Sequence, residues 1–247
     1  MFEISFHDEI AIIELAHGKV NAFDVELCDA LITKLAEIVD SACPAVILSS
    51  QTEGVFSAGI DLKRWLAEGP EYVRPYMNSL EQLFEAIFCF PKPIVADING
   101  AAIAGGCMVA TACDYRVIQP DAKIGILESR LGVALPMMAI EIMRHVALPH
   151  VFRHVTSIGA TYMGQRAVNA GLADEVSDES RSAAIEVTKQ LTSIPLPAFE
   201  LTKRQRTLPV MSVVHENRKQ LLESYMEIWE SDDTRNAIRK YVAQRLN

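Results

Sequence analysis

The sequence lacks the features that mark several large classes of protein. Its five cysteines are scattered, odd in number and without a C-x-x-C pair, so they predict neither a disulfide framework nor a zinc site. The longest uncharged run, residues 98–113, contains three glycines and falls short of the ~20 apolar residues of a membrane helix. The first residues, MFEISFHDEI, are acidic where a signal peptide is basic and then apolar.

Basic charge is also scarce. The chain has 23 Lys+Arg against 32 Asp+Glu, a net charge of −9, which argues against a broad nucleic-acid or anionic-membrane surface. No G-x-x-x-x-G-K-[ST], G-x-G-x-x-G or G-x-S-x-G motif occurs, which disfavours a phosphate-loop nucleotide enzyme and a serine hydrolase. We therefore expect a cytoplasmic protein with no nucleic-acid or membrane partner.

What is present is an ordinary globular composition, with 50% hydrophobic and 22% charged residues over 247 positions. Apolar runs predict strands at residues 4–6, 10–15, 45–48, 94–97, 115–118, 123–127 and 173–176. Helical spacing predicts helices at 23–39, 180–192, 196–207, 213–229 and 233–246. It also predicts one helix that ends near residue 88, with Pro75 near its first turn, and another that ends near residue 112. This order favours α/β layers with helices appended at the C-terminal end.

Two glycine-bearing loops each follow a predicted strand, at residues 54–62 (GVFSAGIDL) and 99–107 (NGAAIAGGC). Glycines at such places let backbone N–H groups approach a ligand, and a helix N-terminus adds positive potential. One N–H from each loop could form an oxyanion hole for a carbonyl oxygen that gains charge. On spacing alone, tight turns and close helix–strand packing explain the same glycines.

Together, the two loops resemble the signatures of the crotonase (enoyl-CoA hydratase/isomerase) superfamily. The resemblance extends to residues 20–22 (VNA), 113–114 (CD), 124–132 (IGILESRLG), 167–176 (AVNAGLADEV) and 231–233 (SDD). It covers nearly the whole chain, and the order and spacing of the motifs make it specific.

The resemblance implies an α/β spiral of ββα units. A core at residues 1–190 would hold the acyl-CoA site, and a helical region at residues 191–247 would serve self-association into homotrimers or dimers of trimers. It also implies acyl-CoA thioester substrates and no separate cofactor, because CoA is part of the substrate. By position, the oxyanion hole would consist of the N–H groups of Ile60 and Gly105.

The substrate-binding residues that the resemblance implies lie in and around the two loops. They are Asn21, Ala22, Ser57, Ala58, Gly59, Asp61, Leu62, Lys63, Gly106, Met108 and Leu131. Lys63 and Arg64 could neutralise CoA phosphates, or they could be two solvated charges at the start of a helix.

Hydratases of this superfamily use two glutamates to hold and activate water. The first lies three residues after the oxyanion glycine, where this chain has Met108, whereas the second corresponds to Glu128 in the segment Gly125-Ile-Leu-Glu. Moving a double bond from 3-enoyl to 2-enoyl needs only one base, so the pattern favours a Δ3-Δ2-enoyl-CoA isomerase with Glu128 as the base. Apolar neighbours would raise the pKa of its carboxyl group. Without the resemblance, Glu128 would be read as a surface carboxylate opening a helix.

Other interpretations stay open. The same enolate chemistry would serve hydration with one glutamate or decarboxylation of a malonyl-type thioester, and the chain could also be an inactive acyl-CoA-binding assembly protein. A dienoyl-CoA isomerase would need an acid near Pro136, and Glu141 is better explained as a charge on a helix face. Three histidines, at positions 145, 150 and 154, are expected on helix surfaces rather than at a metal. Residues 133–142 are expected to line the acyl pocket or the core.

Overall fold

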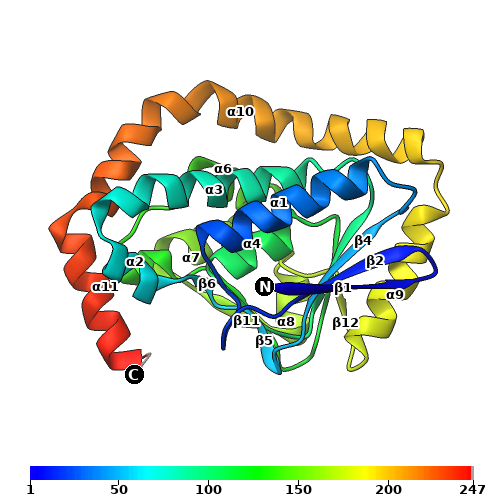
Figure 1. The fold of residues 1–247 in the computed structure, drawn as a ribbon, viewed down its shortest axis with the longest axis horizontal. Coiled ribbons are helices and arrows are strands. Elements are labelled where there is room, and N and C mark those ends of the chain that lie inside the picture. Colours follow the sequence, from blue (N-terminus) through cyan, green and yellow to red (C-terminus); the bar gives the residue numbers. More distant parts are fainter. Residues whose placement is uncertain (246–247) are drawn as a thin grey trace.

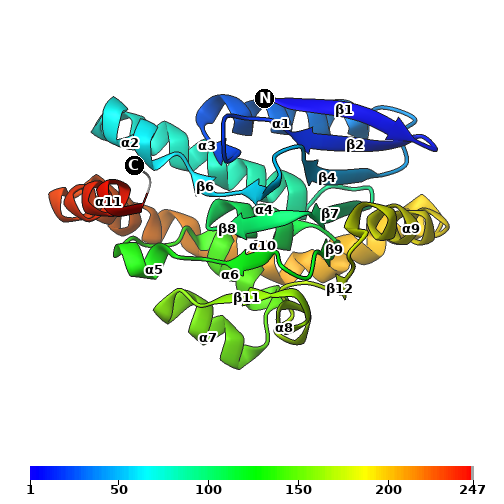
Figure 2. The same ribbon diagram turned by 90° about the horizontal axis from the view of Figure 1, so that it is seen from below.

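The computed structural model describes residues 1–245 and has a six-stranded sheet at its centre (Figures 1 and 2). The strands are, in spatial order, β1 (Phe2–His7), β2 (Ile10–Leu15), β4 (Val46–Ser50), β7 (Ile94–Ile98), β9 (Tyr115–Ile118) and β12 (Glu175–Val176). β1 and β2 form the expected antiparallel hairpin, with positive φ at both turn residues, Asp8 and Glu9. The other neighbours pair in parallel, and β4 and β7 are buried along their whole length.

A second sheet is built from short strands, and the sequence pattern predicted one of them, at residues 123–125 within the longer strand expected at 123–127. Its order is β11 (Thr161–Met163), β10 (Lys123–Gly125), β8 (Gly100–Ile103) and β5 (Gly54–Ser57), and β3 (Ala22–Phe23) pairs separately with β6 (Gly59–Ile60). Strands of two to four residues are too short to show an alternating pattern, which is why the pattern did not predict the others. Each pair of strands leads into a helix, and this repeated ββα arrangement places both glycine loops on one side of the first sheet.

The helices cover both faces of the large sheet. On one side lie α1 (Val25–Val39), α3 (Pro70–Phe88) and α4 (Gly105–Ala112), and on the other α9 (Ser180–Thr192) packs against β4, β7 and β9. The remaining helices are α2 (Leu62–Glu68), α5 (Glu128–Leu131), α6 (Met137–Val146), α7 (Pro149–Ile158), α8 (Gly164–Asn169), α10 (Leu196–Glu230) and α11 (Asp232–Arg245).

Several predicted boundaries differ from those of the structure. α1 begins at Val25 rather than at residue 23, because the Asp24 side chain caps it by accepting the N–H of Leu27. The helix predicted to end near residue 88 is α3, which begins at Pro70, so Pro75 lies beyond its first turn. The separate helix α2, which ends before Gly69, was not predicted. The strand predicted at residues 173–176 is confined to the last two of them.

The C-terminal region also differs from the prediction. The segments 196–207 and 213–229 form the single 35-residue helix α10, which continues through Pro209. Packing against α6 and α3 compensates for the backbone hydrogen bond that the proline removes (Figure 1). α11 begins at Asp232 and packs against α2 and α5 (Figure 2), while Leu246 of the predicted last segment lies outside the described residues.

Candidate active site

The two glycine loops touch one another, and glycine is required at the points of contact. A Cβ at Gly59, whose φ is +84°, would lie 2.6 Å from the backbone nitrogen of Gly105. A Cβ at Gly106 would lie 2.4 Å from the carbonyl oxygen of Ser57. No side chain fits at either distance, so Gly59 and Gly106 allow the end of β5 and the start of β6 to meet the start of α4.

The start of α4 presents free backbone donors at this junction. The first intrahelical bond runs from the N–H of Met108 to the carbonyl of Ala104, so the N–H groups of Gly105, Gly106 and Cys107 have no partner within the helix. No side chain caps this end either. The preceding Ala104 has φ 55° and ψ −123°, a strained conformation for a residue with a Cβ, which costs on the order of 1–3 kcal/mol.

The neighbouring donor comes from β6. Asp61 donates its N–H to the carbonyl of Phe23 across the β3–β6 pair, at 3.1 Å. Because successive N–H groups along a strand point to opposite sides, the N–H of Ile60 points away from β3. Ile60 and Gly105 line one cavity, so the arrangement can offer two backbone donors to a single oxygen atom.

Glu128 is the first residue of α5 and reaches the same cavity. Only 5% of its surface is exposed, and its Oε2 atom has no hydrogen-bond partner among the described residues. Burial in this apolar setting raises the pKa of its carboxyl group from 4.5 to about 7, although backbone N–H groups of Glu128 and Leu127 oppose the rise. A carboxyl group with such a pKa can take up and release a proton near neutral pH.

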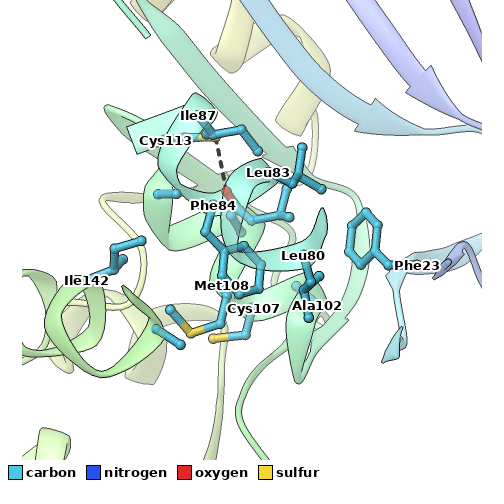
Figure 3. Close-up of a cluster of buried hydrophobic side chains, with 14 of the residues drawn as sticks. Phe23, Leu80, Leu83, Phe84, Ile87, Ala102, Cys107, Met108, Cys113 and Ile142 are labelled. Carbon is cyan, nitrogen blue, oxygen red and sulfur yellow. Dashed lines mark hydrogen bonds between the residues drawn. The ribbon is translucent and has the colours of Figure 1, made fainter. Parts of the chain in front are cut away.

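The cavity is small and otherwise apolar. Besides Ile60, Gly105 and Glu128, it is lined by Met77, Leu80, Phe84, Met108, Ala134, Leu135, Pro136, Ala139, Tyr225 and Trp229. Figure 3 shows Met108 of α4 in a buried cluster with Leu80 and Phe84 of α3. The position that would carry a second carboxylate therefore holds a thioether packed among hydrocarbon side chains.

The side chains of two predicted site residues form hydrogen bonds that hold the loops in place. Asn21 is fully buried, donates to Ser50 Oγ at 2.7 Å and to the Phe56 carbonyl at 3.1 Å, and accepts the N–H of His17 at 2.8 Å. The buried Ser57 hydroxyl donates to the carbonyl of Asn21 at 2.6 Å and accepts the N–H of Gly59. These bonds fix the β3 segment, which contains the half-buried Ala22, against the first glycine loop.

The residues that follow the loop form the start of α2. Asp61 caps the helix by accepting the N–H of Arg64, and Leu62 is buried. Arg64 is paired with Glu26 and Asp24, whereas Lys63 and Ala58 are exposed and Lys63 has no ion pair in the described chain. Of the two predicted phosphate-binding cations, the structure leaves Lys63 available. Leu131 packs half-buried against the core, outside the lining of the cavity.

Sequence reasoning missed the two aromatic residues that α10 contributes. Tyr225 and Trp229, four residues apart on one helix face, line the cavity of Glu128. The indole N–H of Trp229 donates to the carbonyl of Ala134 at 2.9 Å, and its ring contacts Trp65 with centroids 6.0 Å apart. Their spacing in the sequence is a signal of a buried helix face, but nothing in it indicates which cavity they reach.

The alternative candidate groups lie elsewhere or lack the required chemistry. Pro136 lines the cavity at the place where a dienoyl-CoA isomerase would need an acid. Glu141 is buried, pairs with Arg144 at 3.2 Å and faces a separate groove. Within residues 1–245, no three His, Cys, Asp or Glu side chains are grouped so as to hold a metal ion, and no helix is long and apolar enough to cross a membrane.

Comparison with known proteins gives the family of the chain. The family model described as enoyl-CoA hydratase/isomerase matches residues 5–246. The chain belongs to this family. Its fold is accordingly the mixed α/β crotonase fold with a helical C-terminal region, as the resemblance predicted.

Relatives in the enoyl-CoA hydratase/isomerase family carry both activities in their names. Human mitochondrial enoyl-CoA delta isomerase 1 is 26% identical over 238 residues, which cover 94% of this chain and 79% of that protein. A probable enoyl-CoA hydratase of Bacillus subtilis is 26% identical over 247 residues, 96% of this chain and 93% of that protein. The crystal structure of human mitochondrial delta3-delta2-enoyl-CoA isomerase has a TM-score of 0.93 at 25% identity and covers 98% of this chain and 97% of that one.

Proposed function

We propose that this enzyme of the enoyl-CoA hydratase/isomerase family is a Δ3-Δ2-enoyl-CoA isomerase with Glu128 as its single base. The observation that carries the proposal is the composition of the cavity, where one buried carboxylate faces apolar side chains and Met108. Hydration needs a water molecule held between proton-transferring groups, and this cavity offers no second carboxylate among its described lining residues. A double-bond shift requires only that one group take a proton and return it.

In the proposed reaction, the thioester carbonyl of a 3-enoyl-CoA accepts hydrogen bonds from the N–H groups of Ile60 and Gly105. Glu128 removes a proton from C2, and the electron pair moves through the C3–C4 double bond and the carbonyl to give a dienolate. The same carboxyl group then returns the proton to C4, which leaves the double bond between C2 and C3. The backbone donors supply roughly 3–4 kcal/mol each, and general-base catalysis contributes roughly 10²–10⁴-fold.

The remaining assignments belong to this proposal. We assign the exposed Lys63 to a CoA phosphate, and Ala22, Ala58, Gly59, Asp61, Leu62 and Gly106 to the backbone that the CoA ester follows. Asn21 and Ser57 act by holding that backbone, and Leu131 supports α5. No separate cofactor takes part. Self-association of the region 191–247 into trimers or dimers of trimers and a cytoplasmic location stay predictions.

The test is the variant Glu128→Gln, which keeps the shape of the side chain but cannot accept a proton. We expect it to abolish the conversion of 3-hexenoyl-CoA to 2-hexenoyl-CoA while the dissociation constant for hexanoyl-CoA, measured by calorimetry, stays close to that of the wild type. The exposed loop residue Glu53 provides the matched control, Glu53→Gln, which should keep full activity. Full activity in Glu128→Gln would refute the proposal.

The competing functions give different results in the same assays. A hydratase with one glutamate would convert 2-hexenoyl-CoA to 3-hydroxyhexanoyl-CoA, and a decarboxylase would release carbon dioxide from a malonyl-type thioester. An inactive acyl-CoA-binding protein would bind the whole panel of esters and turn over none of them.

A further inference from the structure

A network of polar side chains lies on the far face of the large sheet, which α9 covers, away from the cavity of Glu128. Its centre is Arg181, the second residue of α9. The guanidinium group donates to Glu14 Oε1 at 2.7 Å, to Ser49 Oγ at 2.8 Å and to Asp97 Oδ2 at 2.8 Å. The Ser49 hydroxyl also donates to Asp97 Oδ2, at 2.6 Å. One side chain therefore joins three neighbouring strands, β2, β4 and β7.

The three strand residues of the network occupy equivalent places. Glu14, Ser49 and Asp97 are each the last but one residue of their strand. β2 leads into the segment of Asn21, β4 into the first glycine loop and β7 into the second. Because successive side chains of a strand point to opposite faces, Ser50 points to the near face, where its Oγ atom accepts Asn21 Nδ2 at 2.7 Å. The network thus lies directly behind the backbone that holds the site.

The network also bridges a gap in the backbone pairing of the sheet. The ladder between β4 and β7 ends at Leu48 and Ala96, two residues before each strand ends. The two segments of chain pair again in the second sheet, through β5 and β8. Between these points, side chains join them: the network on the far face and, on the near face, Asn99 Nδ2, which donates to the Ser50 carbonyl at 2.7 Å. The separation of the two glycine loops therefore depends on side chains where the backbone ladder is interrupted.

The network depends on the charge of Arg181. Ser49 and Asp97 are fully buried, and Asp97 Oδ1 has no hydrogen-bond partner among the described residues. A buried carboxylate is costly unless a cation compensates its charge, and Arg181 supplies that cation. Its planar guanidinium also offers several donors in a fixed geometry, so one group can hold three acceptors at once. Without it, we expect the carboxylate to turn toward water and the ends of β4 and β7 to shift.

We propose that Arg181 is a positioning residue for the oxyanion hole, acting from the far face of the sheet through the ends of β4 and β7. The two donors of the hole, the N–H groups of Ile60 and Gly105, follow these strand ends, one in each glycine loop. A hydrogen bond weakens as its length and angle depart from the favoured values, so a small shift between the loops weakens their bonds to a thioester oxygen. The inference rests on the proposed acyl-CoA function and adds to it a residue outside the lining of the cavity.

The infrared band of a bound thioester carbonyl reports these hydrogen bonds without requiring turnover. The probe is hexanoyl-CoA labelled with carbon-13 at the carbonyl, because hydrogen bonds to the oxygen lower the stretching frequency. The wild type should shift the band to a lower frequency than that of the free ester in water. Arg181→Met keeps the length of the side chain but removes the guanidinium, and it should lose at least about half of this shift.

Lys189→Met is the matched control. Lys189 lies on the same helix and pairs with Asp8 at 3.0 Å, in the turn at the opposite end of β2. Because this ion pair is far from the strand ends that lead into the site, Lys189→Met should keep the whole carbonyl shift.

Turnover of 3-hexenoyl-CoA gives the second readout. Arg181→Met should lower kcat roughly tenfold and change KM by no more than about twofold, because misplaced donors weaken the transition state more than the bound substrate. Arg181→Lys keeps the charge but reaches fewer acceptors, so it should lose only part of the carbonyl shift and of kcat. It decides the matter if Arg181→Met does not fold. A purely structural role would lower the melting temperature and leave kcat of the folded enzyme unchanged.

The double variant Arg181→Met/Asp97→Asn separates alignment from stability. Asparagine removes the uncompensated charge, so the melting temperature should rise above that of Arg181→Met, whereas kcat should stay low because no guanidinium joins the strands. The inference is overturned if Arg181→Met and Arg181→Lys keep the carbonyl shift and kcat of the wild type, or if the double variant regains both. A wild type without the carbonyl shift would overturn the oxyanion hole of the proposed function itself, and with it this role of Arg181.

Discussion

Replacing Glu128 by glutamine should stabilise the protein at high pH. Its carboxyl group has a pKa of about 7 in the folded chain, against an ordinary value of 4.5. Because the folded state holds the proton more tightly than the unfolded state, stability falls as the pH rises from about 4.5 to about 7. Each pKa unit corresponds to about 1.36 kcal/mol, so ionising buried Glu128 costs the folded state on the order of 3 kcal/mol.

The Glu128→Gln variant cannot ionise and does not incur this cost. The measurement is urea unfolding of both proteins at about pH 4 and about pH 8. The unfolding free energy of the variant relative to the wild type should rise by about 3 kcal/mol between the two conditions. Glu53→Gln, at an exposed position, should show no such change. A difference between wild type and Glu128→Gln that is the same at both pH values would refute the assignment of a buried, destabilised carboxylate.

Further predictions concern the base and the loop that faces it. The kcat/KM for 3-hexenoyl-CoA should rise with pH and reach half its maximum at about pH 7, because Glu128 acts as a base only when ionised. A kcat/KM that falls over this range would contradict the assignment of Glu128 as the base. Ala104→Gly should raise the urea midpoint, because glycine relieves the strained φ of 55°. The expected gain in unfolding free energy is about 1 kcal/mol after the entropy cost of glycine is subtracted. A lowered midpoint would show that no strain is stored at this residue. Met108→Glu should raise the pKa of Glu128 through like-charge repulsion, which moves the pH–rate midpoint upward; an unchanged midpoint would place the two side chains too far apart to interact.

Much of the site can be predicted from the sequence because its chemistry lies in short segments. The glycines of the two loops and Glu128 occur in patterns with fixed spacing, and the structure brings Ile60, Gly105, Met108 and Glu128 to one cavity. The strands before the loops follow from their apolar runs. These features depend on local sequence, because a short residue pattern determines the backbone conformation there.

The features that the sequence did not predict depend on contacts between residues far apart in the chain. Tyr225 and Trp229 reach the cavity only because α10 continues unbroken through Pro209, and helix propensity alone favours a break there. The strained conformation of Ala104 likewise follows from the packing of neighbouring loops, since nothing in the alanine side chain favours a positive φ. Tertiary packing overrides the local preference in both cases.

The most direct test of a single base is to follow the proton it carries. Glu128 is 5% exposed, so a proton taken from C2 exchanges slowly with solvent before it is returned. With 3-hexenoyl-CoA deuterated at C2, mass spectrometry and NMR of the 2-enoyl product should find deuterium at C4. A wild-type product whose C4 carries only solvent hydrogen would contradict direct return of the same proton by Glu128.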